Sequence, residues 1–156
     1  MSYTNITVEK NGPLAILTLN RPKVLNAINA AMRLEIDDAV TVFEEDSRIH
    51  AIVVTGAGDK AFSAGGDIHE QVAVGDMSLK ALQARSPLQT ATTVNYTWRL
   101  ATCTKPTIGA INGIAFGGAA LLSSSLDIRI GCERTSFRFL AAAYGQANST
   151  WTLPLV

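Results

Sequence analysis

Two glycine-containing stretches decide the fold: Ala61-Phe62-Ser63-Ala64-Gly65-Gly66-Asp67-Ile68 and Asn112-Gly113-Ile114-Ala115-Phe116-Gly117-Gly118-Ala119-Ala120-Leu121. Each follows an apolar, strand-like run, and each precedes a segment with helical character. The first residues of a helix leave backbone N–H groups unpaired. If the two turns converge, two such donors form an oxyanion hole, which stabilises an enolate or a tetrahedral oxyanion. Either turn alone is better explained by ordinary turn chemistry, and only the joint match of the two favours the oxyanion hole.

Length and composition restrict the class of protein. The chain has 156 residues, enough for one domain with a sizeable core. Only 17% of the residues are charged, which fits a subunit that is partly buried in an oligomer. Thirteen basic and 13 acidic residues give a net charge of zero, without the basic patch of a nucleic-acid-binding protein.

The same composition gives expectations about location and metals. Met1–Lys10 lacks the pattern of a signal peptide, and no apolar run has the length of a membrane span, so a cytoplasmic protein is expected. Cys103 and Cys132 show no metal-binding spacing and are expected to be buried free thiols. Two histidines add no recognisable ligand set, so no metal site is expected.

Local patterns predict an α/β fold in which helices cover a sheet. Asn11-Gly12 between two apolar runs predicts a β-hairpin, and Asn26 or Asn29 is the expected N-cap of the first long helix. The predicted strands are Asn5–Glu9, Leu14–Leu19, Ala51–Thr55, Thr107–Ile111, Asp127–Gly131 and Thr135–Phe139, the third and fourth of them buried; the predicted helical segments are Ile28–Phe43, Ser78–Cys103 and Ala119–Ser125.

From about Thr4 to Gly145 the chain resembles the crotonase, or enoyl-CoA hydratase/isomerase, superfamily. The resemblance rests on motifs that agree in order and spacing: Asn20-Arg21-Pro22, Asn26-Ala27, Ala61–Ile68, Lys105-Pro106, Asn112-Gly113, Gly117-Gly118 and Asp127. It implies a spiral of ββα units that forms one domain over residues 1–156. It also implies homotrimers, often paired into hexamers, and an acyl-CoA thioester as substrate, with coenzyme A as part of that substrate and no separate cofactor.

The resemblance also assigns site positions. Gly66 and Gly118 match the two donors of the oxyanion hole. The loop of Lys23, Val24, Leu25 and Ala27 matches the segment beside the pantetheine arm, and Ala64, Gly65, Asp67 and Ile68 match the residues toward the nucleotide end. Lys23 either faces a CoA phosphate or is an ordinary solvated lysine.

The sequence departs from the hydratases of this family at two positions. Those enzymes use two glutamates in paired acid–base catalysis, and the matching residues here are Leu121 and Ala141. Neither side chain can carry a proton, so ordinary hydration is not supported. Other groups that could supply chemistry are His69 and Glu70, after the first glycine turn, and Asn148, in the stretch where decarboxylases of the superfamily carry an orienting polar residue.

Three functional hypotheses stay open. The first is an enzyme that stabilises the enolate of an acyl-CoA thioester. Hydration, isomerisation, decarboxylation and C–C bond cleavage all share that intermediate. The second is a non-catalytic acyl-CoA-binding or structural subunit, and the third is a hydrolase in which His69 positions a water molecule. Relatives continue into a helical C-terminal region, whereas this sequence ends at Val156, so that region is expected to be missing or not included.

Overall fold

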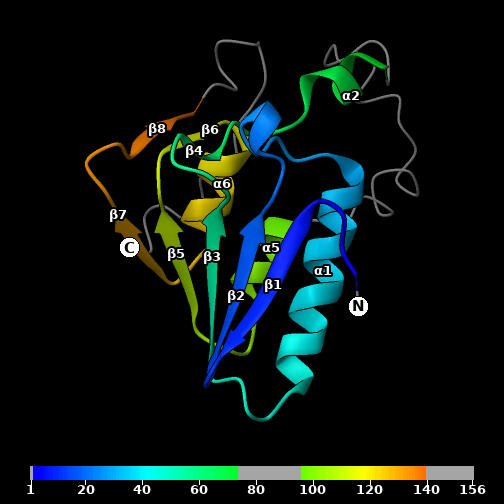
Figure 1. The fold of residues 1–156 in the computed structure, drawn as a ribbon, viewed down its shortest axis with the longest axis vertical. Coiled ribbons are helices and arrows are strands. Elements are labelled where there is room, and N and C mark those ends of the chain that lie inside the picture. Colours follow the sequence, from blue (N-terminus) through cyan, green and yellow to red (C-terminus); the bar gives the residue numbers. More distant parts are fainter. Residues whose placement is uncertain (1, 74–95, 140–156) are drawn as a thin grey trace.

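A computed structural model describes residues 2–73 and 96–139. Its largest element is a five-stranded sheet in the order β1-β2-β3-β5-β7, beside which lies a three-stranded sheet in the order β4-β6-β8 (Figure 1). The strands of the large sheet are β1 Ile6–Asn11, β2 Leu14–Leu19, β3 Ala51–Gly56, β5 Thr107–Ile111 and β7 Ile128–Gly131. Those of the small sheet are β4 Ala61–Ser63, β6 Ile114–Phe116 and β8 Ser136–Arg138.

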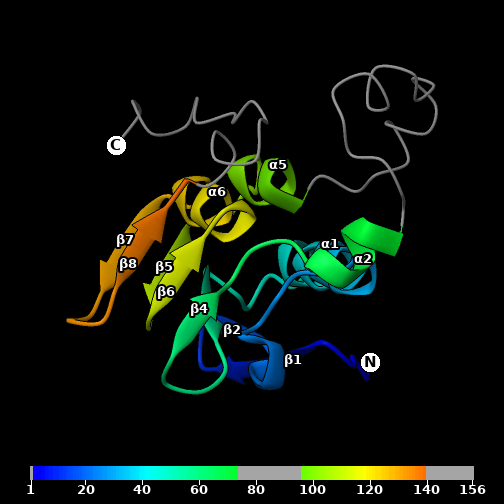
Figure 2. The ribbon, with the colours of Figure 1, turned by 90° about the horizontal axis from the view of Figure 1, so that it is seen from above.

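The helices gather on one side of the large sheet (Figure 2). Helix α1 packs against β1 and β2 and contacts α5, which in turn contacts α6. A short 3₁₀ helix, η1, lies in the loop that precedes α1. The helical bounds are η1 Pro22–Val24, α1 Ala30–Glu45, α2 Ile68–Ala73, α5 Tyr96–Ala101 and α6 Gly118–Ser124.

The chain repeats one unit that gives a strand to each sheet and then a helix. Strand β3 joins the large sheet, β4 joins the small sheet and α2 follows; β5, β6 and α6 repeat this order. Within the large sheet β2, β3, β5 and β7 are parallel, and all pairs of the small sheet are parallel. The expected α/β fold built from ββα units is confirmed.

The core lies between the large sheet and the helices. The sequence spacing that predicted the first helix is confirmed, because Met32, Ile36, Ala39, Val40 and Phe43 form the buried stripe of α1. Asn29 is the N-cap, and its side chain accepts a hydrogen bond from the Met32 N–H at 2.8 Å. The burial of these apolar side chains supplies most of the free energy that holds α1 on the large sheet.

Several expectations need correction. Strands β3 and β5 are not buried on both faces: buried and half-buried residues alternate, because helices cover only one face of the sheet. The predicted helix Ser78–Cys103 is described only from Tyr96 onward, and the rest of it lies outside the described residues. Neither cysteine is buried: Cys103 is half-exposed and Cys132, which follows the edge strand β7, is exposed.

Candidate active site

The two glycine turns meet because their strands pair. Each turn follows a strand of the small sheet, and β4 and β6 are parallel neighbours with Ala61 opposite Ile114 and Ser63 opposite Ala115. Parallel pairing brings the carboxyl ends of both strands to the same edge of the sheet. The turn after β4 therefore lies against the turn after β6, although the two are far apart in the sequence.

The glycine amides are close enough to act together. A Cβ atom placed on Gly118 would lie 3.6 Å from the amide nitrogen of Gly66, and one placed on Gly65 would lie 3.1 Å from the amide nitrogen of Gly118. Gly65 has a φ of +94°, and Gly117 combines a φ of +52° with a ψ of −118°, a conformation that only glycine adopts readily. Glycine is thus needed here both for backbone conformation and for the close approach of the two turns.

Neighbouring backbone groups are paired, whereas the two candidate donors are not. The Gly65 carbonyl accepts from Ile28 at 2.7 Å, the Asp67 N–H donates to Ile28 at 3.1 Å, and the Gly117 N–H donates to Arg138 at 2.7 Å. Among the described residues, neither the Gly66 N–H nor the Gly118 N–H has a hydrogen-bond acceptor. Gly118 is the first residue of α6, where the N–H has no partner within the helix.

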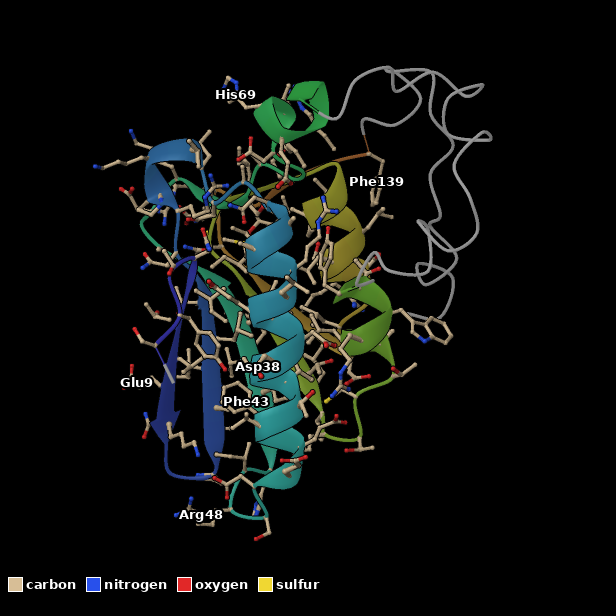
Figure 3. All side chains as sticks on the ribbon, turned by 90° about the vertical axis from the view of Figure 1, so that its right-hand side faces the viewer. Glu9, Asp38, Phe43, Arg48, His69 and Phe139 are labelled. Carbon is tan, nitrogen blue, oxygen red and sulfur yellow. The ribbon has the colours of Figure 1, made fainter. Side chains whose placement is uncertain are left out.

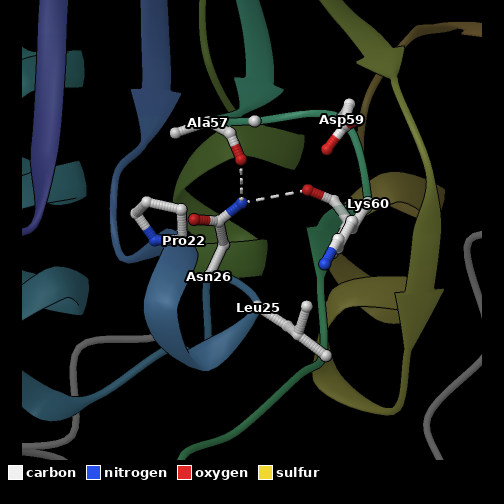
Figure 4. A pocket seen from close by; sticks show the side chains of 8 residues that line it. Pro22, Leu25, Asn26, Ala57, Asp59 and Lys60 are labelled. Carbon is white, nitrogen blue, oxygen red and sulfur yellow. Dashed lines mark hydrogen bonds between the residues drawn. The ribbon is translucent and has the colours of Figure 1, made fainter.

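The loop that precedes α1 is fixed to the first glycine turn. Leu25 and Asn26 both adopt the left-handed conformation, with φ of 52° and 55°. The buried Asn26 amide donates to the carbonyl oxygens of Ala57 and Ala61, both at 2.9 Å (Figure 4). The Leu25 carbonyl accepts from the Ala64 N–H at 2.8 Å. These bonds hold the predicted pantetheine loop against the turn that carries Gly66.

A pocket opens between this loop and the segment after β3. Its volume is about 190 Å³. The lining combines apolar side chains with one acidic and one basic residue, and Figure 4 shows Leu25 and Lys60 on its walls. The lining residues are Pro22, Leu25, Asn26, Ala57, Gly58, Asp59, Lys60 and Ala61.

The predicted substrate-binding residues divide into an exposed and a buried group. Lys23, Val24 and Leu25 are exposed on the loop, and Ile68 is 64% exposed at the start of α2. Ala27 and Gly65 are buried, and Ala64 is half-buried. Of these residues, Lys23, Val24, Leu25 and Ile68 therefore present exposed side chains to a ligand, whereas Ala64 and Gly65 belong to the first glycine turn.

Asp67 has a structural function in this arrangement. It is buried, and its carboxylate lies 2.7 Å from the Arg21 guanidinium, which also donates to the Ala27 carbonyl oxygen. The hydrogen bond from Arg21 holds the pKa of Asp67 below its usual value, although burial opposes this shift. The other carboxylate oxygen accepts from the His69 N–H at 3.1 Å. Asp67 therefore connects the loop before α1 to the start of α2.

His69 and Glu70, the candidate side-chain catalysts, do not line the space beside the glycine pair. His69 is exposed, and its side chain points away from the rest of the described chain (Figure 3). The Glu70 carboxylate accepts from the Ala30 N–H at 3.0 and 2.9 Å. Glu70 thus closes the N-terminus of α1, which explains its position without catalysis.

The position of the first family glutamate lies on α6. Leu121 is half-buried there, and its carbonyl oxygen accepts from the side chains of Ser124 and Ser125. The position of the second, Ala141, lies outside the described residues, as does Asn148. Asp127 orders the start of β7, because its carboxylate accepts from both the N–H and the hydroxyl of Thr107 at 2.8 Å.

A tyrosine that no sequence motif indicates lies beside the glycine pair. Tyr96 is the first residue of α5, and its hydroxyl lies 3.4 Å from the Gly118 carbonyl oxygen. It stands within the long predicted helical stretch, where no motif distinguishes it. Only the packing of α5 against α6 reveals its position.

Within residues 2–73 and 96–139, no group of three or more His, Cys, Asp or Glu residues is arranged to hold a metal ion. In the same ranges, no helix combines the length and the apolar character that a membrane crossing requires.

Comparison with known proteins gives a consistent family. A crotonyl-CoA hydratase of Syntrophomonas wolfei is 39% identical over 88% of this chain and 50% of its own length. The mitochondrial 3-hydroxyisobutyryl-CoA hydrolase of Gallus gallus is 34% identical over 92% of this chain and 36% of its own. An enoyl-CoA hydratase/isomerase structure from Xanthobacter autotrophicus superposes with a TM-score of 0.85 and 30% identity, covering 99% of this chain and 56% of that one.

The chain spans half or less of the length of these curated relatives. The enoyl-CoA hydratase/isomerase family model matches residues 14–145, which include both glycine turns. With the repeated ββα units and the two adjacent glycine amides, this match shows that the chain belongs to the enoyl-CoA hydratase/isomerase family.

Proposed function

We propose that the chain binds an acyl-CoA thioester and stabilises its enolate through the backbone N–H groups of Gly66 and Gly118. One observation supports this most directly: two adjacent glycine amides lie on paired turns, and neither has an acceptor among the described residues. When a thioester carbonyl oxygen accepts hydrogen bonds from both amides, these bonds become stronger as negative charge builds up on the oxygen. The arrangement therefore favours the enolate over the neutral thioester.

The loop geometry supports a CoA ester as the substrate class. The exposed residues Lys23, Val24 and Leu25 are fixed beside the first glycine turn by the Leu25–Ala64 bond. A pantetheine arm along this loop would direct its thioester toward the glycine pair. Both curated relatives described above have names of enzymes that act on CoA esters.

The reaction type follows from the side chains that are missing. Leu121 and Ala141 provide no carboxylate, so the paired acid–base chemistry of hydration has no support at these positions. We propose a lyase or isomerase reaction through an enolate. Of these, decarboxylation needs the least from the protein, because loss of CO₂ forms the enolate without a base.

We also propose a homotrimer or a dimer of trimers, and a cytoplasmic location.

The sharpest test compares two Gly118 variants, one without the backbone N–H and one that keeps it. Proline is tolerated at the first residue of a helix, so Gly118→Pro removes the N–H donor and places the ring Cδ atom where its hydrogen pointed, which closes the hole from that side. Gly118→Ala adds the same Cβ atom and keeps the donor. We expect Gly118→Pro to bind the enolate of acetoacetyl-CoA on the order of 100-fold more weakly than Gly118→Ala. Equal binding by the two variants would contradict the oxyanion hole.

A non-catalytic binding subunit is the second candidate, and Leu121 favours it because the position of the first family glutamate is apolar. Turnover of crotonyl-CoA, followed by the loss of its enoyl-thioester absorbance, separates the two. Binding of acetoacetyl-CoA without turnover of crotonyl-CoA or of a β-carboxyacyl-CoA would support the binding subunit. Rapid hydration would instead show that another group supplies the acid.

A further inference from the structure

The hydroxyl of Tyr96 and the amide nitrogen of Gly66 both lie close to Gly118. The hydroxyl lies 3.0 Å from the position of a Cβ atom on Gly118, and that position lies 3.6 Å from the Gly66 nitrogen. Its contact with the Gly118 carbonyl oxygen is 3.4 Å long, whereas good O–H···O bonds measure about 2.5–3.0 Å. The hydroxyl proton is therefore weakly held and can turn toward a better acceptor.

Arg33 of α1 lies near the same ring. Its guanidinium carbon is 6.0 Å from the centroid of the Tyr96 ring, and its buried Nε has no hydrogen-bond partner among the residues that the structure describes. A cation at this distance stabilises negative charge that builds up on the phenol oxygen during donation. Burial nevertheless raises the pKa of Tyr96, against the effect of Arg33, so the hydroxyl keeps its proton at neutral pH.

The position of Tyr96 is held by packing that does not depend on the hydroxyl. The ring contacts the hydrophobic core, and α5 lies between α1 and α6. A phenylalanine would therefore keep the ring in place and remove only the donor. Leu121, at the position of a family glutamate, cannot donate a hydrogen bond from its side chain. The Tyr96 hydroxyl can, and it lies beside Gly118.

We infer that the Tyr96 hydroxyl is a third hydrogen-bond donor to the enolate oxygen, beside the N–H groups of Gly66 and Gly118. Arg33 is a positioning residue that strengthens this donor. The inference rests on the proposed function, because it requires a CoA thioester whose oxygen lies between the two glycine turns. No bond to hydrogen is broken in this role, and the proton stays on the tyrosine.

The test compares a charged and a neutral ligand. Acetoacetyl-CoA ionises to an enolate that is detected by its absorbance, whereas butyryl-CoA stays neutral. At a fixed pH near neutrality, we expect Tyr96→Phe to weaken binding of the enolate about tenfold and to change butyryl-CoA binding about twofold or less, because hydrogen bonds to charged acceptors are the stronger ones. Arg33→Gln is expected to weaken binding of the enolate as well, by a smaller factor.

Tyr3→Phe is the matched control, since it also removes a phenol hydroxyl, one that donates to Asp38 at 2.8 Å. Tyr3→Phe should leave the affinity for the enolate unchanged. If Tyr96→Phe also leaves that affinity unchanged, or weakens binding of both ligands equally, the inference is overturned and the proposed function still stands. If the unaltered protein binds neither CoA ester, the proposed function itself fails, so the two failures are distinguishable.

Discussion

At the scale of single residues, Gly65 shows how the contact between the turns depends on a missing side chain. A Cβ atom on Gly65 would lie 2.5 Å from the Phe116 carbonyl oxygen and 3.1 Å from the Gly118 nitrogen, both backbone atoms that cannot rotate away. Gly65→Ala should therefore separate the two turns. We expect a loss of about 2–4 kcal/mol in the free energy of unfolding, measured by urea denaturation.

Gly12 provides the control for this prediction. It also has a positive φ, +56°, but a Cβ atom there would meet no atom of the described residues within 4 Å. Gly12→Ala should cost only the conformational strain, on the order of 1 kcal/mol. If the two alanine variants lose equal stability, the conformation of the backbone and not the contact between the turns would explain the glycine at position 65.

At the scale of elements, the start of α1 joins two parts of the site. Asn29 caps the Met32 N–H, and Glu70 of α2 accepts from the Ala30 N–H. Asn29→Ala should lower the free energy of unfolding by about 1 kcal/mol, and Glu70→Gln by about 0.5–1 kcal/mol through loss of a charge at a helix N-terminus. Thermal or urea unfolding measures both effects.

Activity measurements on the same variants separate structure from chemistry. If Glu70 only closes the helix, Glu70→Gln should keep its turnover and its affinity for CoA esters at temperatures where it stays folded. A loss of turnover without a loss of stability would restore Glu70 as a catalytic residue. Asn29→Ala serves as the matched variant, because it weakens the same helix end from a residue with no proposed chemistry.

The elements differ in how far the sequence could predict them. The hairpin of β1 and β2 follows from Asn11-Gly12, and α1 follows from its apolar stripe, since both patterns are local. Of the small sheet only β8 was predicted, within Thr135–Phe139, because β4 and β6 have three residues each and lie within the two glycine stretches. Strands this short depend on pairing with segments distant in the sequence.

The site shows the same limit at the scale of the whole molecule. The motifs indicated Gly66 and Gly118 separately, and only the parallel pairing of β4 with β6 brings their turns together. Tyr96 could not be found, because it reaches the site through the packing of α5 against α6. Glu70 was considered for chemistry, since its contact with the start of α1 has no local sequence signal.

The edge of the large sheet supports a prediction about association. Strand β7 pairs only with β5 among the described strands, and it presents Ile128 and Ile130, which are 51% and 60% exposed, two positions apart and hence on one face. An open strand edge with an apolar face favours pairing with another chain. We expect this chain to self-associate as its concentration rises, measured by sedimentation velocity.

Substitution at this edge tests the explanation. Ile130→Lys places a charge on the exposed face and should shift the association to concentrations about tenfold higher, with little change in stability because the side chain is already exposed. Leu34→Lys on α1 is the matched control, since Leu34 is 58% exposed but lies on a helix without an open backbone edge. If both lysine variants reduce association equally, general surface hydrophobicity and not the edge of β7 drives it.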